Sequence, residues 1–333
     1  MAVTVAIVGA TGETGSSIVK GLLQSRGFEI TALVRPASLQ KPKVRALADQ
    51  GVKVVPVDLG GPEAEIRNAL KGIDVVISAI FAGELLAQIP VIDASKAVGV
   101  KRFIPCFFAT VAPPKGVLRL REVKEDVLNH VKKVYLPYTV IDVGWWYQIT
   151  LPSLPSGRID YATEMSVKDI AGDGSVPTAL TDLRDIGKYV ARIIVDPRTL
   201  NRMVFAYNEV HTFNDVYKML EDVSGEKLKR NYVSAETIKA NLAEAEKKSM
   251  NFLDPDFLKV AHFQYLLSWG IRGDNTPEYA AYLGYLNAKD LYPDVQYTTL
   301  ETFAKELIEG KGQPVYEEMR ALRAARASQE KQQ

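Results

Sequence analysis

The chain has 333 residues, 47 % of them hydrophobic and 24 % charged, with 41 Lys and Arg against 40 Asp and Glu. This composition is typical of a folded globular protein and excludes a long disordered chain or a collagen. The net charge of +1 gives no indication of a nucleic-acid partner. The single cysteine excludes an intramolecular disulfide and a zinc site built on several thiolates, and the three histidines lie far apart, so we expect no metal.

No targeting or membrane segment is visible. Residues Met1–Val8 lack the charged start and the long apolar core of a signal peptide, and they run into a glycine-rich turn. No apolar run approaches the roughly 20 residues that span a bilayer. We therefore expect a cytoplasmic protein with no membrane partner.

The first half of the chain alternates short apolar runs with longer amphipathic stretches. The runs are rich in Val and Ile and predict buried strands at Thr4–Val8, Glu29–Val34, Val52–Val57, Asp74–Ile80, Arg102–Cys106 and Tyr138–Val143. The stretches between them predict helices at Gly15–Ser25, Val44–Gln50, Ala64–Leu70, Leu86–Val98 and Glu122–Lys133. This alternation predicts an α/β fold of the Rossmann type, with a doubly wound parallel sheet.

After Val143 the pattern changes. A helix is predicted at Asp182–Val195, packing back on the Rossmann core, and a returning strand at Met203–Ala206. The rest is predicted as mostly helical, with helices at Asn214–Val223, Ala235–Lys248, Pro255–Trp269, Pro277–Asn287 and Thr299–Gly310, and a solvated terminal helix beyond Pro314. We divide the chain into a cofactor-binding domain, 1–150, and a smaller, mostly helical substrate-binding region, 151–333.

The strongest local signal is the turn Val8-Gly-Ala-Thr-Gly-Glu-Thr-Gly15, between the first strand and the first helix. Gly9 permits the tight turn, Gly12 lets a diphosphate approach the backbone, and Gly15 lets the helix pack close to the sheet. The start of the helix supplies free N–H groups to the phosphates. We assign the dinucleotide contacts to this turn and to the end of the fourth strand, at Gly9, Thr11, Gly12, Glu13, Thr14, Gly15, Ser78, Ala79 and Ile80.

The second predicted strand decides which dinucleotide binds. An acidic residue at its end would favour NAD(H), but this strand ends in Arg35. A guanidinium suits a 2′-phosphate, and Lys43 in the next helix adds a second positive charge. The sequence therefore predicts NADP(H).

A family resemblance rests on segments that occur in a fixed order. Beside Gly9–Gly15 they are Leu33–Arg35, Gly51–Asp58, Asp74–Ser78, Val100–Pro105, Leu136–Thr139 and Thr178–Gly187. Together they resemble the NmrA-like and isoflavone-reductase-like branch of the atypical short-chain dehydrogenases, and its fungal members most of all.

The resemblance implies a catalytic lysine. The isoflavone-reductase-like enzymes carry it on the helix before the sixth strand, and Lys124 stands at that position. A desolvated lysine there would relay a proton and also contact the cofactor. The alternative is a surface lysine in a charged helix. A Tyr-x-x-x-Lys match at Tyr285–Lys289 is expected by chance and lies past the predicted sheet.

The loop after the fifth strand departs from the family pattern. Many plant reductases of the family read Pro-Ser-Glu-Phe-Gly there, whereas this chain has Cys106 at the serine position and Phe107 at the acidic one. A small buried side chain is expected for Cys106 rather than a nucleophile.

Aromatic residues crowd the ends of the fourth, fifth and sixth strands, where open α/β sheets bind ligands. At least two of them are expected to line a pocket for a small aromatic substrate rather than only fill the core: Phe81, Phe107, Phe108, Trp145, Trp146 and Tyr147.

Three functions fit these expectations. The first is an NADPH-dependent reductase of a small aromatic or natural-product substrate. The second is a redox-neutral cyclase or isomerase of alkaloid-type biosynthesis on the same scaffold, which the departure at Phe107 supports. The third is a non-enzymatic NADP(H) sensor that binds a protein partner, as the resemblance to the family's name-giving member implies. The sequence leaves open whether the chain is a monomer or a homodimer.

Overall fold

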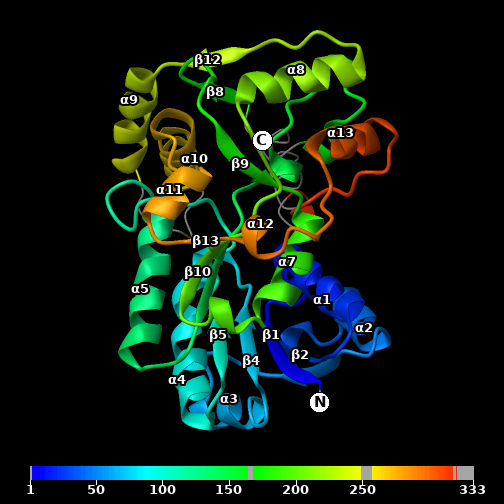
Figure 1. Cartoon of the computed structure of the whole chain (residues 1–333), viewed down its shortest axis with the longest axis vertical. Helices are drawn as coiled ribbons and strands as arrows, with labels where there is room; N and C mark the ends of the chain where they lie inside the picture. The colour runs from blue at the N-terminus through cyan, green and yellow to red at the C-terminus, as the bar shows by residue number, and fades with distance from the viewer. Residues whose placement is uncertain (1, 164–167, 249–256, 318–319, 321–333) are drawn as a thin grey trace, which may run out of the picture.

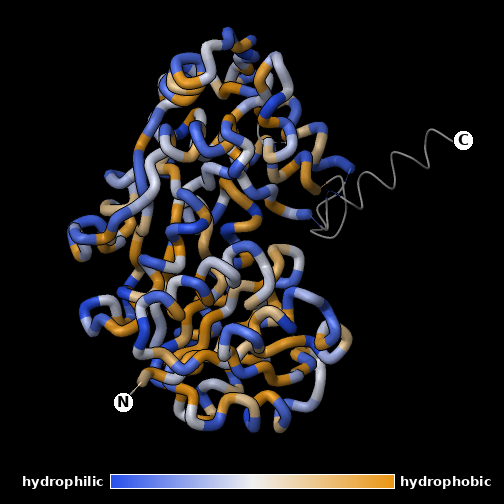
Figure 2. The backbone as a smooth tube through the Cα atoms, turned by 90° about the vertical axis from the view of Figure 1, so that its right-hand side faces the viewer, coloured by the Kyte–Doolittle hydropathy of each residue, from blue (hydrophilic) through white to orange (hydrophobic). Residues whose placement is uncertain are grey.

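The computed structural model describes residues 2–163, 168–248, 257–317 and 320. Two lobes lie one above the other in Figure 1, and chain segments from both halves of the sequence contribute to the lower one. Figure 2 shows many hydrophobic residues inside the lower lobe. Within the described ranges, no helix combines the length and the apolar character needed to cross a membrane.

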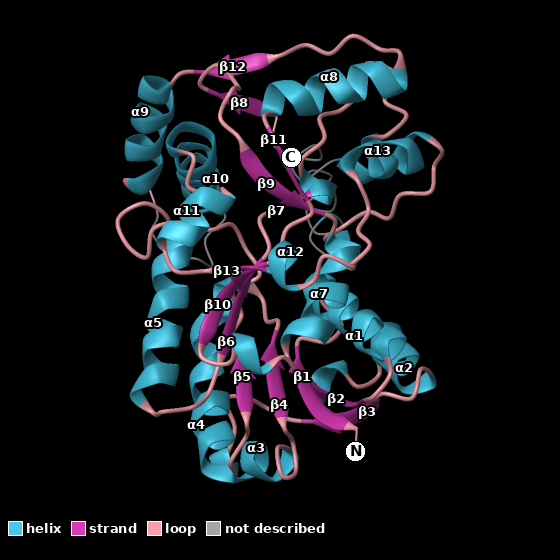
Figure 3. Cartoon of the chain, viewed as in Figure 1, coloured by secondary structure: helices cyan, strands magenta, loops and turns pink. Residues whose placement is uncertain are grey.

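The lower lobe is built on a parallel sheet. Its five main strands are β1 (Val3–Val8), β2 (Phe28–Val34), β3 (Lys53–Pro56), β4 (Val75–Ser78) and β5 (Arg102–Ile104). They pair in the order β3-β2-β1-β4-β5, and every pair is parallel. Figure 3 shows their carboxyl ends directed towards the upper lobe. The predicted Rossmann-type sheet is confirmed.

Three further strands extend this sheet. A parallel bridge between Phe103 and Tyr138 leads from β5 to β6 (Thr139–Asp142). Strand β6 pairs with β10 (Arg202–Phe205), which confirms the predicted returning strand, and β10 pairs with β13 (Leu286–Asn287). The segment that contains Tyr285 therefore lies at the edge of the sheet, and the expectation that it falls past the sheet was wrong.

Helices cover both faces of the sheet. One face carries α1 (Glu13–Ser25), α2 (Pro42–Asp49) and α7 (Ile186–Ile193), whose apolar side chains share one core. The other carries α3 (Glu63–Ala69), α4 (Ile89–Val98) and α5 (Arg119–Lys133). Helices α1 and α7 touch at Gly21 and Gly187, where any added Cβ would clash with the opposite backbone. The predicted helix Asp182–Val195 is shorter in the structure, where α7 packs against α1 and shares its core.

The upper lobe mixes helices with short strands. Its helices are α6 (Asp160–Thr163), α8 (Phe213–Ser224), α9 (Ala235–Glu246), α10 (Phe257–Tyr265), α11 (Pro277–Tyr282) and α13 (Leu300–Ile308). A π-helical stretch, Leu266–Arg272, follows α10, and α12 (Ala288–Leu291) follows β13. The core of this lobe contains Trp269, whose ring stacks on Phe213 at 4.6 Å between centroids.

The strands of the upper lobe differ from the sequence prediction. Strands β7 (Trp145–Trp146), β9 (Thr178–Thr181) and β11 (Glu209–His211) form one small sheet, and β8 (Asp169–Ala171) pairs with β12 (Asn231–Val233). The predicted helix Pro277–Asn287 ends at Tyr282, because Gly284 has a positive φ of 87° and the chain then enters β13. Positions 255 and 256 of another predicted helix lie outside the described residues.

The segment after Pro314 is not solvated as predicted. Val315 is only 4 % exposed and belongs to the core of the lower lobe, and Tyr316 packs against Trp146. Apolar packing against the lower lobe holds these two residues. The predicted helix beyond them falls almost entirely outside the described residues.

Candidate functional site

The glycine turn has the shape of a phosphate-binding loop. Gly12 caps α1, and its N–H donates to the Gly9 carbonyl oxygen at 3.0 Å. Gly9 has a φ of 81°, and a Cβ there would clash with the Ala79 carbonyl at the end of β4. A Cβ on Gly15 would clash with Gly9 itself. Only glycine fits at Gly9 and Gly15, while Gly12 is exposed at the start of a 13-residue helix, which suits the approach of a diphosphate.

Two exposed cations lie where a 2′-phosphate is expected. Arg35 directly follows β2, its side chain is 69 % exposed, and its nearest guanidinium nitrogen lies 3.9 Å from a carboxylate oxygen of Glu84. Lys43, in the first turn of α2, has its ammonium 3.6 Å from a carboxylate oxygen of Glu317. Both cations thus already attract carboxylates, which carry the charge of a phosphate oxygen.

Orphaned polar atoms gather at the carboxyl edge of the sheet. The Ser78 hydroxyl, the Thr110 hydroxyl, the Trp145 indole N–H and Asp142 Oδ1 are buried without a hydrogen-bond partner. Ser78 and Asp142 are the last residues of β4 and β6, Thr110 lies in the loop after β5, and Trp145 begins β7 just beyond β6, so all four lie beyond or at the carboxyl ends of these strands. Buried polar groups are normally paired, and a dinucleotide together with a polar substrate would supply the partners. The residues present therefore fit an NADP(H) site.

Lys124 is buried in the second turn of α5. It is 5 % exposed, and its Nζ donates to the backbone carbonyls of Cys106 at 2.7 Å and Phe107 at 2.6 Å. Burial lowers the pKa of the Lys124 amine, and the positive charge of Arg121 lowers it further, while Asp142 opposes the shift. The alternative of a surface lysine is wrong.

A second buried network adjoins Lys124. Arg121, one helical turn earlier, donates to Asp142 Oδ2 at 2.7 Å, to Glu125 at 2.9 Å and to the Tyr285 hydroxyl. The Tyr285 hydroxyl in turn donates to Asp142 Oδ2 at 2.6 Å. Burial alone would lower the pKa of Arg121, but Asp142, Tyr285 and Glu125 raise it, and the net shift is upward. Helix α5, strand β6 and the residue before β13 thus meet in one ionic cluster.

Tyr285 does not pair with Lys289. The Lys289 Nζ lies 3.3 Å from the Tyr297 hydroxyl and 4.4 Å from the centre of its ring. The Tyr-x-x-x-Lys match is therefore not a proton-donor pair of the short-chain dehydrogenase kind. No local pattern in the sequence marks the role of Tyr285, because its partners lie 143 and 164 positions away.

The loop after β5 is closely packed. Burial raises the pKa of the Cys106 thiol, whose Sγ lies 3.3 Å from the Ile80 carbonyl oxygen, so the thiol stays protonated and is a poor nucleophile. Phe107 is 1 % exposed, and its ring centre lies 4.7 Å from the Arg121 guanidinium and 5.8 Å from Lys124 Nζ. The ring at the family's acidic position thus contacts two cations through its face.

The six aromatic residues predicted at the substrate site fall into three groups. Phe107, Phe108 and Tyr147 are buried, and Phe81 is 57 % exposed. Trp145 and Trp146 in β7 are half-buried. Substrate contact by any of the six stays a prediction, and the two tryptophans are the pair that combines a ring surface with partial exposure.

Distant segments add two aromatic residues that sequence analysis did not single out. The ring of Tyr265, at the end of α10, lies 4.8 Å from that of Trp145, edge on. Tyr316 stacks on Trp146 at 6.1 Å with 23° between the ring planes. No local pattern marks either tyrosine, since each is defined by a partner more than 100 positions away.

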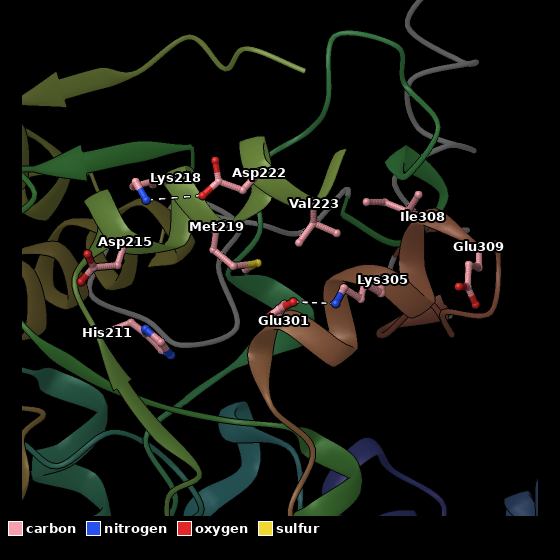
Figure 4. Close-up of a pocket in the computed structure, with 10 residues that line it drawn as sticks. All are labelled: His211, Asp215, Lys218, Met219, Asp222, Val223, Glu301, Lys305, Ile308 and Glu309. Atoms are coloured by element: carbon pink, nitrogen blue, oxygen red, sulfur yellow. Dashed lines mark hydrogen bonds and ion pairs between the residues drawn. The ribbon is translucent and has the colours of Figure 1, made fainter. Parts of the chain in front are cut away.

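A surface groove in the upper lobe lies apart from these residues. It has a volume of about 760 Å³ between α8 and α13 (Figure 4) and is lined by His211, Asp215, Lys218, Met219, Asp222, Val223, Glu301, Lys305, Ile308 and Glu309. Both lysines of this lining are paired, Lys218 with Asp222 and Lys305 with Glu301. None of the ten belongs to the predicted cofactor or substrate residues, so the groove is not the candidate active site.

Known proteins resemble this chain over nearly its whole length. Asnovolin J 5′,6′-dehydrogenase nvfM of Aspergillus novofumigatus is 46 % identical over 314 residues, covering 92 % of this chain and 96 % of that protein. Phenylcoumaran benzylic ether reductase Pyrc5 of Pyrus communis is 31 % identical, covering 90 % and 97 %. The solved structure of leucoanthocyanidin reductase with NADPH from Vitis vinifera superposes with a TM-score of 0.76 at 26 % identity, covering 92 % and 99 %.

The family model agrees with these relatives. The model of the NmrA-like family matches residues 1–304, which include the glycine turn, Arg35 and Lys124. The resemblance inferred from the sequence is thereby confirmed, and so is the similarity to a fungal protein. The chain belongs to the NmrA-like family.

Proposed function

We propose that the protein reduces a small aromatic or natural-product substrate with NADPH and that Lys124 supplies or relays the proton. The observation that carries this proposal is a buried amine at the carboxyl edge of a Rossmann-type sheet, held by two backbone carbonyls beside an ionic cluster. A lysine in such a setting titrates closer to neutral pH than an exposed one, as a proton-transfer group requires.

The enzyme class and the cofactor agree with the comparisons. The similar proteins are named as a dehydrogenase and as reductases, and a solved structure contains NADPH. They confirm the expectation of an NADP(H)-dependent oxidoreductase of the isoflavone-reductase-like type. The substrate and the role of Lys124 are the parts that we propose.

Different residues would bind different parts of the cofactor. The N–H groups at the start of α1 would hold the diphosphate, and Arg35 and Lys43 would hold the 2′-phosphate. When bound, NADPH supplies the hydride. The buried, unpaired polar atoms of Ser78 and Asp142, at the carboxyl ends of β4 and β6, support a reactive end and a substrate bound at this edge of the sheet.

The contacts of Lys124 determine what it can do with a proton. A neutral amine has two N–H groups and one lone pair. The carbonyls of Cys106 and Phe107 can accept both N–H groups, which leaves the lone pair free to take a proton. Once protonated, the ammonium has a third N–H to donate. The same geometry therefore serves as acid in reduction and as base in the reverse oxidation.

The aromatic side of the site supports the substrate class. Trp145 and Tyr265 come from different segments of the upper lobe, and Trp146 continues the same strand as Trp145. Flat rings favour an aromatic substrate, and the free Asp142 Oδ1 would accept a hydrogen bond from a hydroxyl on it.

One experiment tests the reaction type. The protein is incubated with NADPH deuterated at C4 and a panel of aromatic natural products that carry reducible double bonds or benzylic ethers. Deuterium in a product and matching loss of NADPH are expected. Product formed without deuterium and without NADPH consumption would instead show a redox-neutral reaction.

The role of Lys124 is tested with the substrate so found. Lys124→Met should lower turnover by roughly 10² to 10⁴ while NADPH affinity stays within a few-fold, and Lys124→Arg should fail similarly because a guanidinium keeps its proton. Lys20→Met, at an exposed position of α1, is the matched control. Full turnover in Lys124→Met would remove Lys124 from the mechanism.

A further inference from the structure

The residues Gly312–Glu317, which we call the C-terminal strap, connect the two lobes. The strap begins on the upper lobe, where the Gly312 N–H donates to the Tyr161 hydroxyl at 3.0 Å. That hydroxyl in turn donates to the Leu307 carbonyl in α13 at 2.9 Å. The start of the strap is therefore fixed to α6 and α13.

The middle of the strap packs into the lower lobe. Val315 is 4 % exposed among core side chains of the Rossmann sheet, and the Tyr316 ring stacks on Trp146. Tyr316 has a φ of 57°, a left-handed conformation that is unfavourable for a residue with a Cβ. Apolar burial and stacking must outweigh that cost, so this position of the strap is maintained by specific contacts.

The end of the strap contacts two residues of the predicted cofactor site. The Tyr316 N–H donates to Glu13 Oε1 at 3.0 Å, in the first turn of α1. The Glu317 carboxylate lies 3.6 Å from Lys43 Nζ. The strap thus contacts the start of α1, which would hold the diphosphate. Its Glu317 carboxylate pairs with Lys43, which would hold the 2′-phosphate.

We propose that the C-terminal strap is an autoinhibitory element that competes with NADP(H) for this end of the cofactor site. The proposal rests on the proposed function, because it takes Lys43 and the first turn of α1 as cofactor contacts. Binding of NADP(H) then requires the strap to leave both positions.

Charge favours competition over joint occupation. A carboxylate and a 2′-phosphate are both anions, so Glu317 at Lys43 repels the phosphate that would bind there. Arg35, the other predicted phosphate contact, already lies near Glu84, which adds a second negative charge nearby. A 2′-phosphate that binds at Arg35 and Lys43 must therefore displace the acidic side chains near both cations.

The strap contacts differ in strength. The side chains of Lys43 and Glu317 are 53 % and 59 % exposed. Ion pairs that are this exposed to water contribute little to stability. Val315 and Tyr316 hold the strap through burial and stacking. Removing the charge of Glu317 should therefore relieve only the competition at the 2′-phosphate, whereas removing the apolar contacts should release the whole strap.

The test uses full-length variants with NADPH and NADH as probes, titrated by nucleotide fluorescence. Glu317→Gln is expected to tighten NADPH binding about two- to fivefold and to leave NADH binding unchanged, because only NADPH carries the 2′-phosphate. The double variant Val315→Ala/Tyr316→Ala is expected to tighten both nucleotides at least tenfold. Glu309→Gln removes an exposed carboxylate that pairs with Lys311 and is the matched control, with no change expected.

A second readout follows the strap itself. Chymotrypsin cleaves after tyrosine, so cleavage after Tyr316, identified by mass spectrometry, should rise when the wild type is saturated with NADPH. No rise would contradict release of the strap. Circular dichroism establishes that each variant is folded, and Glu317→Gln, a change at an exposed position, keeps the test decisive if the double variant unfolds.

The possible results separate the two proposals. Unchanged NADPH affinity in both strap variants would overturn the competition, and weaker affinity would show that the strap instead covers bound cofactor. If the wild type itself shows no preference for NADPH over NADH, the assignment of Arg35 and Lys43 to a 2′-phosphate fails, whatever the strap variants do.

Discussion

The replacement Lys124→Met tests whether the buried amine loses its proton more readily in the folded protein. Burial lowers its native pKa, whereas an unfolded chain has an ordinary lysine pKa of about 10.4. Between the lowered native value and about pH 10.4 the unfolded state binds one more proton than the folded state. The stability of the wild type relative to the Met variant therefore rises with pH across this window.

The expected slope follows from that proton difference. One proton corresponds to about 1.4 kcal/mol of unfolding free energy per pH unit within the window, and to no slope outside it. The variant also loses the hydrogen bonds to the Cys106 and Phe107 carbonyls, about 0.5–1.5 kcal/mol each. That loss is partly offset because a desolvated amine is removed, and it does not depend on pH. The slope, not the level, is thus the diagnostic quantity.

Urea unfolding of the wild type and of Lys124→Met at pH 7, 8, 9 and 10 measures the slope. Lys20→Met controls for the loss of a lysine from an exposed position on α1. A difference between wild type and Lys124→Met that stays flat from pH 7 to 10 would refute the reasoning, since it would mean that burial leaves the amine with its ordinary titration.

Three further predictions concern other parts of the site. Arg35→Ala should weaken NADPH binding by about 1.5–3 kcal/mol in a fluorescence titration and hardly affect NADH, and equal losses would contradict a 2′-phosphate contact. Asp142→Asn leaves the buried Arg121 without its closest carboxylate and should cost about 3 kcal/mol of unfolding free energy in urea, against about 1 kcal/mol for Tyr285→Phe; similar losses would contradict a buried ion pair. Trp145→Ala should raise the substrate KM while the NADPH Kd stays unchanged, and wild-type kinetics would mean that the substrate pocket lies elsewhere.

The lower lobe could be predicted from the sequence because its signals are local. A buried parallel strand needs a run of apolar residues, and the run Glu29–Val34 corresponds to β2 at Phe28–Val34. The bounds shift by a residue or two where pairing, not composition, ends the strand. Strand β5, for example, ends at Ile104, two residues before the predicted Cys106.

The strands of the upper lobe could not be predicted in the same way. Strand β7 has two residues, and its pairing with β9 depends on a partner more than 30 positions away. Strand β13 is equally short and follows a segment with helical spacing. Two or three residues provide no period, so only the tertiary partner defines such strands.

The site divides along the same line. The glycine turn is contiguous, so its three glycines can be recognised from their spacing in the sequence alone. The proposed substrate contacts and the ionic cluster beside Lys124 come from several segments, among them α5, β6, β7, the end of α10 and the residue before β13. Tyr265 and Tyr285 therefore carry no local signal. Sequence patterns can therefore identify the part of a site that one continuous segment forms. They cannot identify a part to which several distant segments each contribute one or two residues.

Helix α5 belongs to both halves, which has a mechanistic consequence. Its later turns pack Val127 and Val131 into the core of the lower lobe, while the Arg119 N–H at its start donates to Gln264 of the upper lobe at 2.9 Å. Lys124 lies between these contacts, but both of its carbonyl acceptors belong to the lower lobe. Lys124, the proposed proton-transfer group, is therefore held by the lower lobe, which contains the proposed cofactor residues, and not by the aromatic residues of the upper lobe. We therefore expect that aromatic residues of the upper lobe can be replaced without moving Lys124.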